Sequence, residues 1–175
     1  MTTTTLTRPS ETEYAPVYAR YVARIPEGDI VSILDEQMHA SAELLDGLSE
    51  SQGDYRYAPG KWSIKEVVSH VADAERVFAY RALWFSRGDE NELPGFDEQG
   101  WVPNSGAASR ALRDVADELR AVRLATIAFA RSVSEEQSLR SGVASGYRVT
   151  VRGLLYIIAG HEAHHVAILR ERYLK

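Results

Sequence analysis

The chain has 175 residues with 25 acidic and 20 basic side chains, and its net charge of −5 argues against nucleic acid as a partner. Apolar residues make up 45% of the chain and charged residues 26%, a balance that excludes a disordered protein and suits one domain over residues 1–175. Cysteine is absent, which excludes a disulfide scaffold, a thiolate zinc site, an iron–sulfur cluster and a cysteine nucleophile.

The start of the chain, residues 1–10, is polar and threonine-rich, and we do not expect a signal peptide there because it lacks an apolar core. The longest apolar run, residues 154–159, is far shorter than the roughly 20 residues that a membrane span needs. We therefore expect a cytoplasmic protein that has no membrane partner.

Helical spacing of the apolar residues predicts four long helices preceded by a short one. A capping box at Ser10 and Glu13 opens the short helix, and a second box at Ser63 and Glu66 opens the second long helix. Thr150 is a suitable N-cap for the last helix. The predicted helices cover residues 11–24, 29–50, 63–87, 109–132 and 150–173.

The connections between these helices are unequal. Residues 88–108 form a long connection with two prolines and four glycines, which is typical of a functional loop or of a crossover between distant helices. Residues 134–137 suit a short capped turn, and residues 147–151 suit a brief extended segment. The expected fold is all-α: a four-helix bundle with a long crossover loop between its second and third helices and a short N-terminal helix. Because the last helix is apolar on all sides, we expect it to be buried.

Three of the five histidines lie in the sequence His161-Glu162-Ala163-His164-His165. On a helix, His161 and His165 are one turn apart with Cβ atoms about 5–6 Å from each other, so that both imidazoles can bind one cation. His70 lies on an apolar face of the second long helix, which the bundle can bring against the last one. Three neutral ligands leave a position for water or substrate, the pattern of catalytic metal sites.

Other interpretations of these residues remain open. The histidines could be core residues bonded to backbone carbonyls. The string His161-Glu162-x-x-His165 matches the zinc metalloprotease motif. However, only ten residues follow it, and these must supply the third metal ligand. The position of Glu162 also fits an ordinary residue on an exposed face of the helix. A di-iron site would use Glu36-x-x-His39 and Glu162-x-x-His165 with bridging carboxylates, but would leave His70 and His161 unused. The candidate bridging residues are Glu66, Glu75 and Glu118.

The chain resembles the DinB-like superfamily of metal-binding four-helix bundles. The resemblance rests on the Lys61-Trp62-Ser63 segment continuing through His70 to Glu75, on the loop Leu93-Pro94-Gly95-Phe96-Asp97, and on the last helix. It runs from about residue 57 to the end of the chain. The family's metal site has one histidine on the second helix and a His-x-x-x-His pair on the fourth, which implies His70, His161 and His165 as the metal ligands here.

The resemblance also implies a function. Similar members include transferases and isomerases that use low-molecular-weight thiols such as bacillithiol or mycothiol, and homodimers are frequent. A divalent metal with an open position lowers the pKa of a bound water or thiol and so creates a nucleophile for a small-molecule electrophile. Zinc and nickel suit three imidazoles. The alternative is a non-catalytic metal-binding or ligand-binding module of a stress response.

Four residues are candidates for the surroundings of the metal. Asp73 lies one turn after His70 and is a candidate to orient its ring. Asp97 and Trp101, in the long loop, either overhang the metal or anchor the loop. His164 is interpreted as a neighbour of the site rather than a ligand. Arg81, on the second long helix, is interpreted as solvated surface.

Overall fold

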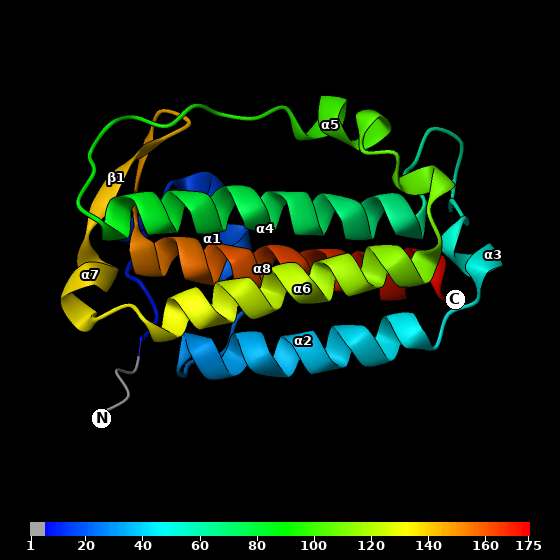
Figure 1. Ribbon diagram of the computed structural model, residues 1–175, viewed down its shortest axis with the longest axis horizontal. Helices are drawn as coiled ribbons and strands as arrows, with labels where there is room; N and C mark the ends of the chain where they lie inside the picture. The colour runs from blue at the N-terminus through cyan, green and yellow to red at the C-terminus, as the bar shows by residue number, and fades with distance from the viewer. Residues whose placement is uncertain (1–5) are drawn as a thin grey trace.

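A computed structural model describes residues 6–175; the first five residues of the polar start lie outside the described part of the chain. Four long helices lie side by side along the molecule (Figure 1). Helix α4 packs against α8 and α6, and α2 packs against the same two helices on the other side of the bundle. The four-helix bundle is therefore confirmed, with the long helices α2 (Ile30–Asp46), α4 (Ile64–Ser86), α6 (Leu112–Arg131) and α8 (Val151–Ile168).

The chain runs in the same direction in α4 and α6, which lie next to each other (Figure 1). The connection between them must therefore return along the whole length of the bundle, as expected of a crossover. It is not structureless, because it contains the helix α5 (Glu98–Asn104) and a 3-10 turn at Ala107–Ser109.

Side-chain caps fix where the long helices begin. Ser63 and Glu66 form the predicted capping box at α4, and the Thr150 hydroxyl accepts a hydrogen bond from the Gly153 N–H at α8. The first long helix is shorter than expected: it ends before Gly47, and a capping box at Ser49 opens a separate short helix, α3 (Glu50–Gly53). Helix α8 passes into a π turn, Leu169–Tyr173.

The N-terminal segment is broken rather than one helix over residues 11–24. It consists of two 3-10 turns, Glu11–Glu13 and Pro16–Tyr18, followed by the short helix α1 (Ala19–Val22). Proline disfavours helical backbone in the residue before it, which separates the first turn from the second. Glu13 anchors the segment, since its carboxylate accepts hydrogen bonds from Thr150 and Arg152 at the start of α8.

A two-stranded hairpin modifies the all-α expectation. Strands β1 (Ser141–Ala144) and β2 (Tyr147–Thr150) are antiparallel, and the short helix α7 (Glu135–Leu139) precedes them. Positive φ angles at Ser145 and Gly146 produce the tight turn between the strands. The extended segment expected near residues 147–151 is the second strand of this hairpin.

Arg81 is buried in α4 and not part of the solvated surface, contrary to expectation. Its guanidinium donates hydrogen bonds to the Pro94 carbonyl and to the Ser145 hydroxyl, at 2.8 and 2.9 Å, and lies over the rings of Phe78 and Phe96. It thereby fastens the crossover loop and the hairpin turn to the bundle. Local sequence patterns could not reveal this role, because 64 positions separate Arg81 from Ser145.

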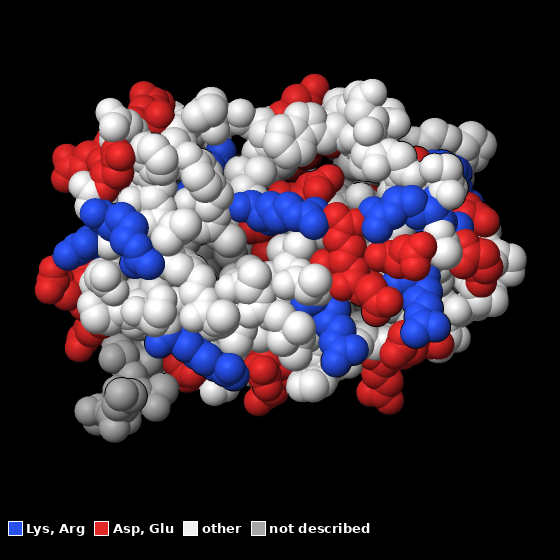
Figure 2. All heavy atoms as spheres, in the orientation of Figure 1, with Lys and Arg blue, Asp and Glu red and all other residues white. Residues whose placement is uncertain are grey.

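Helix α8 is the most deeply buried of the long helices, as its apolar sequence predicted: every side chain from Val151 to Glu162 except Arg152 is buried. Within residues 6–175, no helix is long and apolar enough to span a membrane. Acidic and basic side chains are intermixed on the face shown in Figure 2, and no continuous basic stripe crosses that face.

Candidate metal centre

Three histidine side chains from two helices meet inside the bundle. His70 comes from α4, and His161 and His165 come from successive turns of α8. The Nε2 atom of His161 lies 3.1 Å from that of His70 and 3.2 Å from that of His165. One nitrogen of each ring lies within 4.8 Å of the other two, and no other group of three potential ligands this close was found in residues 6–175.

Burial keeps these imidazoles in their neutral form. His70 and His161 are each only 4% exposed. Burial lowers the pKa of His70 to about 4 and that of His165 to about 3. Burial, followed by the neighbouring histidines, lowers the pKa of His161 well below its usual value. All three rings are therefore unprotonated near neutral pH, which is the form that binds metals.

The short distances between the nitrogen atoms fit a shared cation. The Nε2 atom of His161 carries either one N–H or one in-plane lone pair, so it cannot form a good hydrogen bond with both neighbours. Bonds of about 2.0–2.1 Å from a common ion would give N···N separations of 3.1–3.2 Å at angles of about 100°. The three residues therefore fit a divalent metal that has three imidazole ligands.

Aromatic side chains from separate parts of the chain surround the three rings. Trp62 packs against His70 with ring centroids 5.0 Å apart, and Tyr21 packs edge-on against His161 at 5.4 Å. Gly160 permits this second contact, because a side chain at that position would overlap the Tyr21 backbone. The histidines are thus held in fixed positions by α1 and by the segment before α4.

A cavity on the surface of the bundle is lined by one of the three histidines. It has a volume of about 240 Å³ and includes His165. Its walls are mostly aromatic and aliphatic, with polar groups supplied by Lys61 and by Gln99 of the crossover segment. The cavity is large enough for a small molecule, and its remaining lining residues are Tyr57, Gly60, Trp62, Val67, Ile168 and Tyr173.

Three of the four residues that were predicted to surround the metal make other contacts in the structure. Asp73 is bonded to Arg76 at 3.1 Å rather than to His70. Asp97 is the N-cap of α5, and Trp101 is 44% exposed and packs against Phe96, so both belong to the loop's own structure.

His164 lies beside the three histidines. Its ring packs against Tyr21 and against His165, with centroids 5.4 and 5.2 Å apart. Burial, followed by the charges of Arg24 and Arg20, lowers its pKa.

The structure does not assemble the di-iron alternative. His39 is exposed, and Glu66 caps α4 and pairs with Arg56. Glu118 pairs with Arg76 and Arg110. These side chains therefore have separate structural roles.

Glu162 is buried, and the expectation that it lies on an exposed face of its helix is wrong. It is 3% exposed, and its carboxylate contacts Arg123 and Ser41. These contacts occupy the group that would act as the general base of a zinc metalloprotease. Arg123 was not predicted to be important, because a lone arginine in an amphipathic helix gives no local sign of burial.

Comparisons with known proteins agree with this fold. A family model described as the DinB superfamily matches residues 33–169. A protein of Geobacillus thermodenitrificans named "Putative metal-dependent hydrolase" is 26% identical over 123 residues, 69% of either chain. A protein of Oceanobacillus iheyensis with the same description is 24% identical over 130 residues, 73% of this chain and 74% of its own.

Two solved structures share the architecture. YfiT from Bacillus subtilis, described as a probable metal-dependent hydrolase with an unusual four-helix bundle topology, superposes with a TM-score of 0.70 at 20% identity, covering 93% of this chain and 89% of its own. A mycothiol-dependent maleylpyruvate isomerase superposes with a TM-score of 0.62 at 15% identity, covering 78% and 58%. At these sequence identities, the likeness shows a shared fold and nothing more.

Proposed function

Since this chain belongs to the DinB superfamily, we propose that it is a metal-dependent enzyme whose divalent ion is held by His70, His161 and His165. The observation that carries the proposal is the meeting of three neutral imidazoles from two helices, two of them buried and that of His165 half-buried, with Nε2 atoms 3.1 and 3.2 Å apart. The names of the two bacterial relatives, which describe metal-dependent hydrolases, support it.

The reaction is nucleophilic attack on a small electrophile. A divalent ion held by His70, His161 and His165 would lower the pKa of a bound water or thiol and so would supply a nucleophile near neutral pH. The nucleophile bonds to the electrophilic carbon of the substrate, and the leaving group departs with the proton that the nucleophile has released. Because the chain has no cysteine, any thiol must be a separate small molecule. The likeness to a mycothiol-dependent isomerase favours this version of the reaction.

The protein's own residues bind and enclose the substrate. The cavity beside His165 places Trp62 and Tyr173 against an apolar portion of the substrate, and Lys61 and Gln99 at its polar groups. Tyr173 is held in place because its hydroxyl donates a hydrogen bond of 2.8 Å to the Trp62 carbonyl. Zinc and nickel are our first candidates for the ion, because both accept three imidazoles.

The proposal is tested by metal analysis followed by assays. The purified protein is expected to contain about one divalent ion per chain by elemental analysis. After removal of the metal by a chelator, zinc or nickel should restore turnover of chromogenic esters or of chromogenic electrophiles offered with small thiols. His39→Ala is the matched control because this histidine is exposed. Stoichiometric metal without turnover would support the non-catalytic binding module instead, and absence of metal would contradict the proposal.

A further inference from the structure

Arg123 connects all four long helices from within the bundle. It lies on α6 and is only 1% exposed. Its Nε and Nη2 atoms donate to both carboxylate oxygens of Glu75 on α4, at 2.9 and 2.8 Å, and its Nη1 donates to the Leu34 carbonyl on α2 at 3.2 Å. Its Nη2 also lies 2.5 Å from Glu162 Oε2 on α8.

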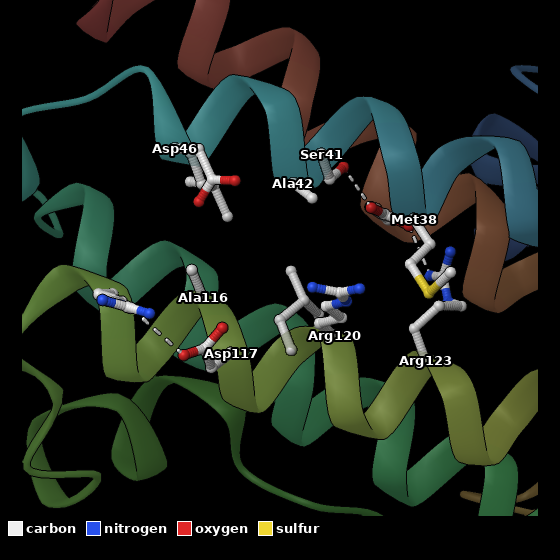
Figure 3. Close-up of a pocket in the computed structure, with 12 residues that line it drawn as sticks. Met38, Ser41, Ala42, Asp46, Ala116, Asp117, Arg120 and Arg123 are labelled. Carbon is white, nitrogen blue, oxygen red and sulfur yellow. Dashed lines mark hydrogen bonds and ion pairs between the residues drawn. The ribbon is translucent and has the colours of Figure 1, made fainter.

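Glu162 is held from a second direction by α2. The Ser41 hydroxyl donates a hydrogen bond of 2.5 Å to Glu162 Oε1. Ser41 and Arg123 face each other at a cavity of about 210 Å³ between α2 and α6, which Glu162 also lines (Figure 3). This cavity includes none of the three histidines.

The cluster formed by Glu75, Arg123, Glu162 and Ser41 contains one basic and two acidic side chains. One guanidinium faces two carboxylates, which gives one net negative charge when both acids are ionised. Within residues 6–175, neither carboxylate pairs with another basic side chain. A buried charge is costly unless an opposite charge lies nearby. The three histidines are neutral, so a divalent ion bound to them would supply the missing positive charge.

The position of Glu162 links this cluster to the histidines. It directly follows His161 and points about 100° away from it around the helix axis. The bonds from Glu162 to α2 and α6 therefore restrain rotation of α8 about its own axis. That rotation determines whether His161 and His165 both point toward His70.

We propose that Glu162 is a positioning residue for the three-histidine centre. Arg123 and Ser41 hold its carboxylate, which fixes the rotation of α8, and together with Glu75 it offsets part of the metal's positive charge. This inference rests on the proposed function, because it requires a metal ion at the three histidines. Groups that hydrogen-bond to metal ligands commonly change metal affinity by about 10-fold to 100-fold when they are mutated, and we expect a comparable effect from a residue that fixes the ligand-bearing helix.

Glu162→Gln tests the inference, because glutamine keeps the shape of the side chain and removes its charge. We expect the zinc dissociation constant, measured by competition with a chelator, to rise at least about 10-fold. The visible absorption spectrum of the cobalt-substituted protein should also change, because the imidazoles are no longer held at the same angles. Ser41→Ala keeps the charge, removes one hydrogen bond and should weaken zinc binding by a smaller factor. It serves as the second variant if Glu162→Gln does not fold.

Glu13→Gln is the matched control. It breaks another carboxylate pair with α8, at Arg152, nine positions before His161. We expect it to lower the midpoint of urea unfolding and to leave both the zinc dissociation constant and the cobalt spectrum unchanged. If Glu162→Gln and Ser41→Ala behave like this control, Glu162 is only structural and the inference is wrong. If the wild-type protein binds no metal, the proposed function fails as well, so the two failures are distinguishable.

Discussion

The Nε2 atoms of His70 and His161 lie 3.1 Å apart, although 91 positions separate the two residues in the chain. The contact joins α4 to α8, which pack against each other in the bundle. A metal at this point would bind only the folded protein, because the unfolded chain does not bring these residues together. Metal binding should therefore contribute directly to stability.

Zinc is expected to raise the free energy of unfolding, and His161→Ala should abolish this effect. At a free metal concentration 100 times the dissociation constant, the increase would be about 2.7 kcal/mol. Urea unfolding with and without zinc measures it, and circular dichroism checks that the variant keeps its helix content. His39→Ala should retain the full increase. An equal increase in His161→Ala would mean that zinc binds elsewhere.

The metal-free protein should lose stability as the pH falls from about 6.5 to 5. The pKa values of His70 and His165 are lowered to about 4 and about 3 by burial, whereas the unfolded histidines titrate near 6.5. Below pH 6.5 the unfolded state therefore takes up protons that the folded state does not. Each such histidine contributes a loss of up to about 1.4 kcal/mol per pH unit.

Urea unfolding at several pH values between 7 and 5 tests this dependence. His70→Gln removes one of the titrating groups and should reduce the slope by about one proton. A stability that stays constant over this range would show that the histidines are protonated in the folded protein, contrary to their burial.

Gly160→Ala should destabilise the protein by about 1–3 kcal/mol, because the new methyl group would overlap the Tyr21 backbone and push α1 away from α8. Gly47→Ala is the control. Its methyl group would meet neighbouring carbonyl oxygens at an ordinary 3.6 Å, and the backbone φ of −78° suits alanine. Thermal or urea unfolding compares the two variants, and equal stabilities would contradict the close packing of α1 on α8.

Arg81→Met should loosen the crossover loop while the bundle stays folded. Methionine keeps much of the apolar volume but cannot donate to the Pro94 carbonyl or the Ser145 hydroxyl. Hydrogen exchange followed by mass spectrometry should show faster exchange in residues 93–97 and 143–147, with the exchange of α8 unchanged. Unchanged exchange in both loop segments would mean that other contacts suffice to hold them.

Much of the fold follows from local sequence signals. The caps at Ser63 and Thr150 set the first residues of α4 and α8 because a side-chain oxygen satisfies backbone N–H groups only a few positions away. The four long helices are predicted by apolar residues that recur with a period of about 3.6 residues, which is also a relationship between positions close together in the chain. The tight hairpin turn at Ser145 and Gly146 was not predicted as such, because only part of its second strand was recognised.

The sequence by itself therefore determined the four long helices, the apolar character of α8 and, with the family resemblance, the three histidines as candidate ligands. Only the tertiary structure decided which of the other charged residues matter. Glu162 was expected on an exposed face and Arg123 drew no attention, yet both are buried in one cluster that joins four helices. Their partners lie between 39 and 121 positions away, so that the energy of these contacts depends on how whole helices pack and is not encoded in any local pattern.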